Sequence, residues 1–286
     1  MKIIRASVLG FCFGVRRAVE LAEKALNDYP DNNVYSLGPL IHNETALKAL
    51  GDKGLKIVEE EDVSTLPTNS VVIIRAHGVG PEVIEVLKRK ECTIIEATCP
   101  RVKASQKMVT KYCDEDEYII LTGDKNHGEV IGIAGYAGKN FTLIQTLEEA
   151  KNLDLSNIKD KKVILLSQTT FSPKIFNEIE NLLKTKIKNL KVMNTICPAT
   201  NERQQSLIDL CKKVDGVLVI GGKASANTIR LYQTAQTNCK RACHIQGVDD
   251  IPQDFYHMET VGITAGASTP DGIIQKIENV LLSYNR

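Results

Sequence analysis

Short apolar runs alternate with longer segments of helical periodicity from one end of the chain to the other. The clearest strand-like runs occupy residues 71–75, 118–121, 163–167, 216–220 and 260–264. Short runs that are apolar at nearly every position are typical of strands buried on both faces of a sheet. Their alternation with helical segments predicts parallel sheets covered by helices, so the expected fold class is α/β.

Helical segments are expected over residues 15–29 and after Pro81, Pro173, Thr228 and Pro270. In the first of them the apolar residues recur at helical spacing and share one face. Ser172-Pro173 and Thr269-Pro270 each combine a capping side chain with a proline suited to a first helical turn. We therefore expect a helix to be capped by Ser172 and another by Thr269.

Three cysteines, Cys12, Cys99 and Cys197, stand between a strand-like run and a helix-like run. The strand-like runs cover residues 2–9, 92–98 and 191–196, and the helical segments begin near residues 15, 101 and 199. Proline follows two of the cysteines directly, as suits the first position of a helix. The positive end of a helix favours a thiolate, so these thiols are candidates for chemistry.

The three cysteines recur at comparable intervals, and each is followed by two polar loops rich in small residues. This regularity predicts three βα-rich blocks around a pseudo-threefold axis, with loops meeting at the carboxyl ends of the strands, where ligands of α/β sheets bind. The expected domains are residues 13–98, 99–195 and 196–286. The N-terminal strand, within residues 1–12, is expected to pack centrally or on the third domain.

Composition narrows the function classes. The 286 residues are 43% hydrophobic and 25% charged, with a net charge of +1. That balance gives no electrostatic case for binding nucleic acid or acidic membranes. No apolar run approaches the ~18–20 residues that span a bilayer, and the N-terminus lacks a secretory stretch, so we expect a cytoplasmic protein. Neither a Walker motif nor a dinucleotide glycine fingerprint is present.

Eight cysteines in a long chain without an export signal are expected to be reduced. Cys92, Cys113 and Cys211 are interpreted as core residues, and Cys239-x3-Cys243-His244 lacks the second ligand pair of a zinc finger. Cys12, Cys99 and Cys197 are either core thiols or shared metal ligands. Three distant thiolates suit an iron–sulfur cluster better than a structural zinc site, and a three-ligand cubane leaves one iron open.

Several polar residues in the strand-end loops are candidate ligands of an anion. His42, His77 and His127 lie in loops rich in glycine or asparagine, and imidazole donates hydrogen bonds to phosphate oxygens. Ser225, Asn227 and Ser268 offer neutral donors. The histidines and hydroxyls also have ordinary alternatives as loop hydrogen-bonders and helix caps.

Glu129 is the most informative acid of the chain. It leads into the apolar run 130–136, whereas most other carboxylates lie in charged segments. A carboxyl in a partly desolvated pocket has a raised pKa and can act as a general acid. The alternative is a glutamate in the first turn of a helix, stabilised by the helix dipole.

An ordered set of motifs resembles the 4-hydroxy-3-methylbut-2-enyl diphosphate reductases, the IspH/LytB family. The motifs run in order from about residue 1 to residue 275. They are Gly10-Phe11-Cys12-Phe13-Gly14-Val15, Ala76-His77-Gly78-Val79, Ala97-Thr98-Cys99-Pro100, His127-Gly128-Glu129-Val130, Gln168-Thr169-Thr170, Ile196-Cys197-x-Ala199-Thr200 and Ala265-Gly266-Ala267-Ser268.

The resemblance implies a trefoil of three α/β domains around a 4Fe–4S cluster held by Cys12, Cys99 and Cys197. It implies reductive removal of an allylic hydroxyl as water, giving isopentenyl and dimethylallyl diphosphate in the last step of the methylerythritol phosphate pathway. Glu129 matches the proton-delivering carboxylate, with Thr169 and His127 beside the substrate. The positions around the diphosphate are matched by His42, His77, Thr170, Ser225, Asn227 and Ser268. A ferredoxin or flavodoxin is the implied electron donor.

The chain departs from the family pattern at two positions beside Ser225. Ala224 and Ala226 stand where relatives often have asparagine and a second serine. One lost hydrogen bond to a charged group corresponds to about 1.5–3 kcal/mol, so a modestly lower substrate affinity is expected. A quinolinate-synthase-like dehydratase and a non-enzymatic iron–sulfur sensor are the alternative functions.

Overall fold

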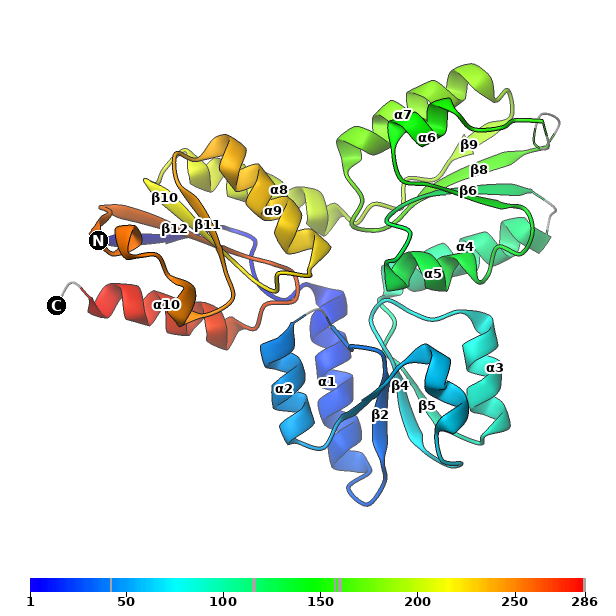
Figure 1. Cartoon of the computed structure of the whole chain (residues 1–286), viewed down its shortest axis with the longest axis horizontal. Coiled ribbons are helices and arrows are strands. Elements are labelled where there is room, and N and C mark those ends of the chain that lie inside the picture. The colour runs from blue at the N-terminus through cyan, green and yellow to red at the C-terminus, as the bar shows by residue number, and fades with distance from the viewer. Residues whose placement is uncertain (42, 115–116, 157, 159–160, 285–286) are drawn as a thin grey trace. The chain divides into compact units, whose positions relative to one another are not determined.

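The computed structural model describes residues 1–41, 43–114, 117–156, 158 and 161–284 (Figure 1). The strands in these residues form three four-stranded sheets in which every pairing is parallel. The first sheet, in spatial order, is β3 (Lys56–Val58), β2 (Val34–Leu37), β4 (Val71–Ile74) and β5 (Thr93–Glu96). The second is β7 (Phe141–Ile144), β6 (Tyr118–Thr122), β8 (Val163–Ser167) and β9 (Leu190–Val192). The third is β11 (Ala242–Ile245), β10 (Gly216–Ile220), β12 (Thr260–Ala265) and β1 (Lys2–Arg5).

The helices in the described residues follow the alternation predicted from the sequence. They are α1 (Phe13–Asp28), α2 (Glu44–Asp52), α3 (Pro81–Arg89), α4 (Pro100–Asp114), α5 (Gly128–Ala134), α6 (Leu147–Lys151), α7 (Pro173–Lys186), α8 (Pro198–Cys211), α9 (Ala226–Asn238) and α10 (Asp271–Ser283). Short 3-10 helices cover Glu60–Thr65 (η1), Val248–Asp250 (η2) and Gln253–His257 (η3). The predicted α/β class is thereby confirmed. In this part of the chain no helix is long and apolar enough to cross a membrane.

The three sheets repeat one topology. Each sheet has two central strands and two edge strands. The last strand in each spatial order given above lies at an edge and precedes a candidate cysteine in the sequence. These edge strands are β5 before Cys99, β9 before Cys197 and β1 before Cys12. The N-terminal strand thus completes the C-terminal sheet by pairing with β12. The repeat predicted from the cysteine spacing is present in the strand order.

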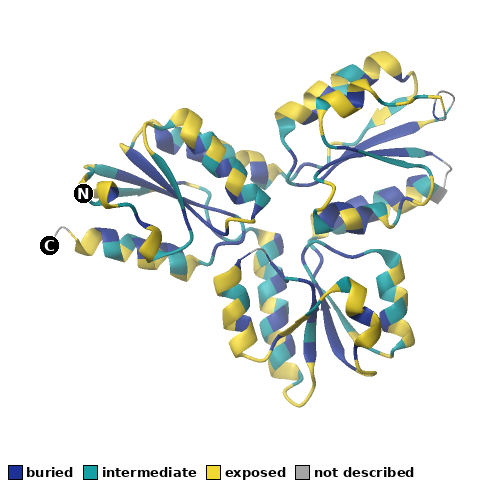
Figure 2. Ribbon diagram, in the orientation of Figure 1, coloured by how far each residue is buried: buried dark blue, intermediate teal, exposed yellow. Residues whose placement is uncertain are grey.

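Alternate residues of a central strand enter different cores, as expected for sheets covered on both faces. In β6, Ile119 packs with α4 and α5, whereas Ile120 packs with α6 and α7. Figure 1 shows these two helix pairs on opposite faces of the second sheet, and Figure 2 shows its central strands β6 and β8 buried. In β10, Val219 likewise faces α8 and α9, and Ile220 faces α10.

Contacts divide the chain into two compact units. Unit 1 comprises Met1–Val19, Ile41–Lys53 and Pro198–Arg286, and unit 2 comprises Glu20–Leu40 and Gly54–Cys197. The first and second sheets belong to unit 2 and the third to unit 1. The three domain ranges and the trefoil arrangement expected from the sequence stay predictions.

Some local expectations are corrected by the structure. The runs expected over residues 92–98 and 191–196 form strands only over Thr93–Glu96 and Leu190–Val192. The strand expected over residues 2–9 ends at Arg5, because Val8 N–H donates to Ser206 Oγ (3.0 Å) instead of continuing the ladder. Thr269 does not cap a helix: the residue before α10 is Pro270, and Thr269 Oγ1 donates to Ile220 O (3.0 Å). Ser172 does cap α7, as expected, by accepting a hydrogen bond from Ile175 N–H.

Candidate functional site

The three candidate metal-ligating cysteines are anchored by the same backbone contact. Each donates its N–H to a carbonyl in the loop that follows the neighbouring strand, and a helix starts at the next residue. The acceptors are Ala267 O for Cys12 (3.0 Å), Ala76 O for Cys99 (2.9 Å) and Thr169 O for Cys197 (2.8 Å). All three cysteines are half-buried and none of them forms a disulfide. The common anchoring places every candidate thiol at the carboxyl end of its sheet, beside a second loop.

The loop that carries Cys99 is held by Glu96. This carboxylate accepts a hydrogen bond from Thr98 N–H (3.1 Å) and forms an ion pair with Lys103 Nζ (2.8 Å). Burial raises the pKa of Glu96, but the hydrogen bonds from Lys103 and Thr98 outweigh it and leave the pKa below its ordinary value. Glu96 is therefore ionised, and its contacts on both sides of Cys99 fix the course of the backbone there.

Glu129 combines the two environments that the sequence left open. It lies in the first turn of α5, yet its residue exposure is 2%. Both carboxylate oxygens are bound by one residue: Thr169 N–H donates to Oε1 (2.6 Å) and Thr169 Oγ1 donates to Oε2 (2.7 Å). A buried carboxyl in contact with a hydroxyl is placed to exchange a proton with it.

Thr169 connects the buried acid to a candidate metal ligand. Its N–H and hydroxyl bind Glu129, while its carbonyl accepts the N–H of Cys197. Just before Cys197, Thr195 Oγ1 donates to Ser167 O and accepts from Ser167 N–H (2.9 Å). The loop that carries Cys197 is therefore bonded both to Ser167 at the end of β8 and to Thr169. Thr169 in turn binds Glu129, so one residue connects the acid to the cysteine loop.

His127 lies beside Glu129 and its hydrogen bond defines its tautomer. Its Nδ1 accepts the N–H of Glu129 (3.1 Å), which requires that Nδ1 carry no proton. The neutral ring therefore bears its proton on Nε2. The ring of His77 lies edge-on to His127, with 5.2 Å between the centroids.

A second group of candidate residues lies in unit 1, at the carboxyl ends of β10 and β12. Ser225 is the N-cap of α9, where its Oγ accepts from Thr228 N–H, and Asn227 lies in the first turn. Ser268 is 5% exposed and directly follows Ala267, which accepts the N–H of Cys12. Among the described residues the Nδ2 of Asn227 is buried and lacks a hydrogen-bond partner. An unused amide donor of this kind is suited to an anionic ligand.

Two glycines allow these loops to approach the first turn of α9. A Cβ on Gly221, whose φ is +153°, would lie 2.7 Å from Thr228 Oγ1, and a Cβ on Gly266 would overlap the same oxygen. The loop after β10 and the loop after β12 therefore pack on Thr228 only because both glycines lack a side chain.

The structure thus gathers the predicted residues in two groups. Unit 2 holds Cys99, Cys197, His77, His127, Glu129, Thr169 and Thr170, and unit 1 holds Cys12, Ser225, Asn227 and Ser268. In unit 2 the hydroxyl of Thr170 accepts from Gln168 Nε2 (3.1 Å). The predicted ligand His42 lies outside the described residues.

The other cysteines occupy ordinary packing positions. Cys211 is 6% exposed in the core beneath α8 and α9, where burial and the neighbouring Cys239 raise its pKa to about 12. Cys113 is half-buried and donates its S–H to Ala137 O (3.2 Å). His244, next to Cys243, is bonded through Nε2 to Gly221 O (2.9 Å). These contacts agree with the structural interpretation of Cys113 and Cys211.

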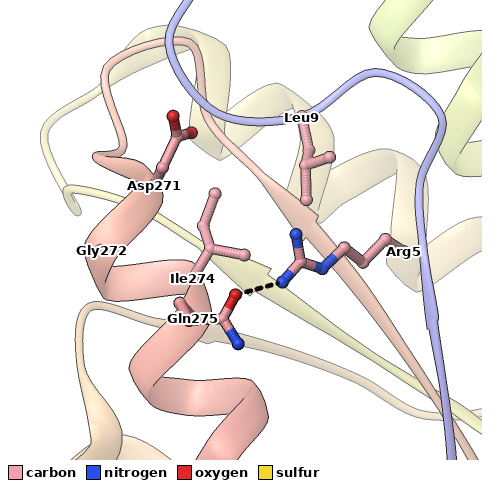
Figure 3. A pocket seen from close by; sticks show the side chains of 6 residues that line it. All are labelled: Arg5, Leu9, Asp271, Gly272, Ile274 and Gln275. Atoms are coloured by element: carbon pink, nitrogen blue, oxygen red, sulfur yellow. Dashed lines mark hydrogen bonds between the residues drawn. The ribbon is translucent and has the colours of Figure 1, made fainter.

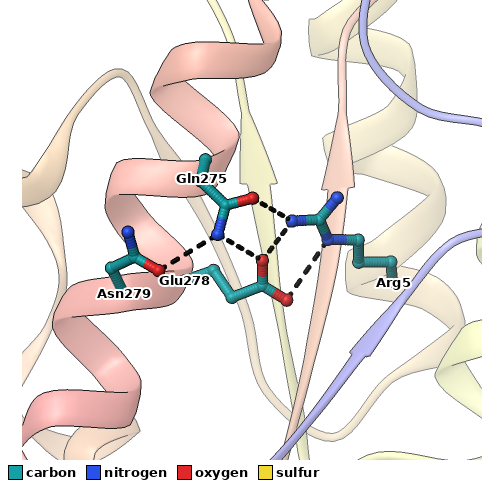
Figure 4. A network of polar contacts seen from close by, with 4 residues as sticks. All are labelled: Arg5, Gln275, Glu278 and Asn279. Carbon is teal, nitrogen blue, oxygen red and sulfur yellow. Dashed lines mark hydrogen bonds and ion pairs between the residues drawn. The ribbon is translucent and has the colours of Figure 1, made fainter.

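A cavity of about 310 Å³ lies in unit 1, and its lining shares no residue with the predicted site. It is lined by Arg5, Leu9, Asp271, Gly272, Ile274 and Gln275 (Figure 3). The Arg5 guanidinium is engaged by Glu278 and by Gln275 Oε1 (2.9 Å), and Gln275 continues the network to Asn279 (Figure 4). These contacts fasten β1 to α10, and none of the lining residues was predicted to bind substrate.

The chemistry of the three thiols fits an iron–sulfur cluster. Within the described ranges no three His, Cys, Asp or Glu side chains form a compact metal-binding group. Cys12 belongs to unit 1 and the other two cysteines to unit 2. The donor set itself matches a cluster: three half-buried cysteines outside any disulfide, each beside a helix start and on an equivalent backbone anchor.

Comparison with known proteins decides the family. The family model described as LytB protein matches residues 3–282. The chain belongs to the LytB family. A 4-hydroxy-3-methylbut-2-enyl diphosphate reductase from Treponema denticola is 44% identical to this LytB chain, over 99% of each chain.

Two solved structures resemble the LytB chain along nearly its whole length. The E-1-hydroxy-2-methyl-but-2-enyl-4-diphosphate reductase from Plasmodium falciparum matches with a TM-score of 0.90 and 30% identity, covering 98% of this chain and 87% of that one. An (E)-4-hydroxy-3-methyl-but-2-enyl diphosphate reductase, described as the terminal enzyme of the non-mevalonate pathway, matches with a TM-score of 0.76 and 38% identity, covering 99% of both. The resemblance inferred from the motifs is confirmed.

Two buried polar residues next to predicted site residues of this LytB chain were not predicted from the sequence. Gln168 is fully buried, and its Oε1 accepts Asp124 N–H (2.9 Å) while its amide donates to Thr170. Arg75 carries a largely buried guanidinium at the end of β4. The available signal was a polar residue directly after an apolar strand, which is common to many loops and does not identify a function.

Proposed function

We propose that this LytB protein is a cytoplasmic 4-hydroxy-3-methylbut-2-enyl diphosphate reductase. The substrate's allylic hydroxyl leaves as water after uptake of two electrons and two protons, and the products are isopentenyl and dimethylallyl diphosphate. The family, the name of the Treponema relative and the two solved structures support this reaction. The observation that carries it in this chain is the buried Glu129 bound through Thr169 to the Cys197 loop.

Cys12, Cys99 and Cys197 are the proposed ligands of a 4Fe–4S cluster. When bound, such a cluster supplies electrons and a Lewis-acidic iron that has no protein ligand. The protein's part is to orient the three thiolates. Their backbone N–H groups are already used by loop carbonyls, so the thiolates are held by fixed main chain.

The geometry of Glu129 and Thr169 indicates how a proton reaches the leaving hydroxyl. Glu129 Oε1 already accepts a backbone N–H, so the acidic proton belongs on Oε2, which faces Thr169 Oγ1. When Oε2 is protonated, its bond with Thr169 Oγ1 reverses: Oε2 donates to the threonine hydroxyl, and that hydroxyl donates its own proton to the substrate oxygen. Glu129 is left as a carboxylate stabilised by the Thr169 N–H. Thr169 thus acts as a relay, and Glu129 is the general acid.

Neutral donors account for binding of the diphosphate by a protein with little net charge. In unit 1 the proposed donors are the hydroxyls of Ser225 and Ser268 and the Nδ2 of Asn227. In unit 2 they are His77, Thr170 and the Nε2–H of His127, with His42 as a further proposed contact. Hydrogen bonds to an anion are stronger than those between neutral groups.

Anaerobic turnover tests the reaction. The cluster-loaded protein is mixed with (E)-4-hydroxy-3-methylbut-2-enyl diphosphate and reduced methyl viologen, and products are separated by chromatography. Consumption of two viologen equivalents per product is expected. A protein that holds iron but consumes no substrate would contradict the reductase, and turnover of a dicarboxylate would indicate a dehydratase.

We further propose that the electron donor is a small acidic redox protein, such as a ferredoxin or flavodoxin, and that it docks on α4. This helix starts directly after Cys99, and from Pro100 to Cys113 it contains no acidic residue. Arg101, Lys107 and Lys111 are exposed, and within the described residues no carboxylate pairs with them. A basic face beside a cluster ligand favours encounter with an acidic partner.

Charge reversal on α4 tests the docking surface. Lys107→Glu with Lys111→Glu is expected to raise the KM for a reduced acidic [2Fe–2S] ferredoxin about tenfold at low ionic strength, because steering is lost. Turnover with reduced methyl viologen should persist, since this cation is not repelled by new carboxylates. Lys174→Glu with Lys188→Glu makes the same charge change at exposed positions elsewhere. An equal effect of both pairs on ferredoxin would contradict docking on α4.

A further inference from the structure

Arg75 is a buried cation next to two candidate substrate-binding histidines. It follows β4 directly and precedes Ala76-His77. Its side chain is 11% exposed and forms an ion pair with Glu60 at the start of η1, whose side chain is 22% exposed. Arginine is rarely buried this far unless it is paired. Both side chains of this ion pair are therefore mostly buried.

The guanidinium lies directly against the backbone of the segment that carries Glu129. A Cβ built on Gly128 would lie 2.7 Å from Arg75 Nη2 and 3.0 Å from Cζ. Gly128 is the first residue of α5, and its φ is not in the left-handed region. Any residue could adopt the backbone conformation of Gly128. A glycine is therefore needed at this position because Arg75 lies so close, and not because of the backbone.

The same guanidinium contacts the turn after β2. A Cβ on Gly38 would overlap Arg75 Nη1, and Gly38 has a φ of +64°. Glu60 pairs with Nη2, the nitrogen that also faces Gly128. Burial raises the pKa of Glu60, and the charge of Arg75 opposes that shift. Arg75 is thus held by Glu60 and by the turn at Gly38, and it contacts Gly128.

Gly128 stands between the two residues whose orientation matters for proton transfer. Before it, His127 uses Nδ1 to accept the N–H of Glu129, and after it Glu129 reaches Thr169. Arg75 is also two residues before His77, whose ring contacts His127. A shift of Gly128 would therefore move the histidine and the acid together.

We propose that Arg75, oriented by Glu60, is a positioning residue that fixes the His127-Gly128-Glu129 segment for the proposed reduction. The planar fork of arginine suits this task because it covers a peptide group and pairs with a carboxylate at once. The inference rests on the proposed function for its catalytic consequence. Its structural part, the coupling of Arg75 to Gly128, stands on the contacts alone.

A double-mutant cycle between positions 75 and 128 tests the proposal. Alanine is a better helix former than glycine, so Gly128→Ala alone would stabilise α5 if nothing touched it. In the cluster-loaded enzyme we expect Gly128→Ala to lower kcat about 10- to 100-fold, as small misplacements of reacting groups do. In an Arg75→Ala background the same change should alter kcat less than about twofold, because the colliding group is absent.

Gly272→Ala is the matched control. Gly272 also lies in the first turn of a helix, α10, and nothing lies within 4 Å of a Cβ placed there. This change should leave kcat unaltered in both backgrounds. If Arg75→Ala does not fold, Arg75→Met retains most of the apolar stem and replaces it in the cycle.

A second readout separates positioning from stability. The ¹⁵N signal of His127 Nδ1 reports its tautomer, and in the cluster-loaded wild type it should be that of an unprotonated acceptor. Arg75→Ala should move it toward a mixture of tautomers. A lower melting temperature with unchanged kcat and unchanged His127 signal would show a structural ion pair only and overturn the proposal. A wild type that turns over no substrate would refute the proposed function, and the His127 signal would still test the positioning.

Discussion

Serine in place of Cys12, Cys99 or Cys197 is expected to remove the cluster and all turnover with it. A serine hydroxyl does not ionise near neutral pH and is a poor ligand for iron in such clusters, where thiolates are the usual donors. Folding should survive, because the anchoring bond at each position uses the backbone N–H and not the side chain. Iron and sulfide per chain, measured after anaerobic purification, should fall in each variant.

Cys113→Ser supplies the matched control for these variants. Cys113 is also half-buried, and its S–H donates to Ala137 O, a bond that a serine hydroxyl can make. This variant should keep its iron, its visible absorbance and its turnover. Full iron content in all three ligand variants would show that the assignment is wrong, whereas a loss shared with Cys113→Ser would indicate a general effect of thiol removal.

The elements of the fold were predictable where local signals sufficed. Apolar runs gave β8 and β10 with the bounds that the structure has. The cap residue explains one shift: α9 begins at Ala226, before the expected Thr228, because Ser225 accepts the Thr228 N–H. The end of β1 depended on Ser206, far along the chain, so no local pattern could locate it.

The candidate site was predictable in its residue types but not in its contacts. The sequence left Glu129 as either a helix-dipole residue or a desolvated acid, and the structure shows that it is both. The contacts that could not be predicted come from Thr169, which lies on the neighbouring strand-end loop and binds both carboxylate oxygens. Arg75 escaped notice for a similar reason, because Gly38, Glu60 and Gly128 come together only in the folded chain.

Glu129→Gln is expected to lower turnover by ~10²–10⁴-fold, the usual span for loss of general acid catalysis, while leaving the iron content unchanged. The substitution preserves both contacts of the side chain. The amide oxygen can accept the Thr169 N–H, and the amide nitrogen can donate to Thr169 Oγ1, so the site should keep its shape. The properties removed are the transferable proton and the charge of the ionised carboxylate. Steady-state rates with reduced methyl viologen should therefore fall in kcat with little change in the substrate KM.

Glu148→Gln is the control, because Glu148 also lies in the first turn of a helix, α6, but is exposed and paired with Lys151. It removes the same charge from the same helical position without touching Thr169, and turnover should be unchanged. If the two variants behave alike, Glu129 matters only for the helix dipole and the proton comes from another group. If only Glu129→Gln is slow, burial and the contact with Thr169 are what make this glutamate an acid catalyst. Thr169 then links that acid to the loop of one proposed metal ligand, Cys197.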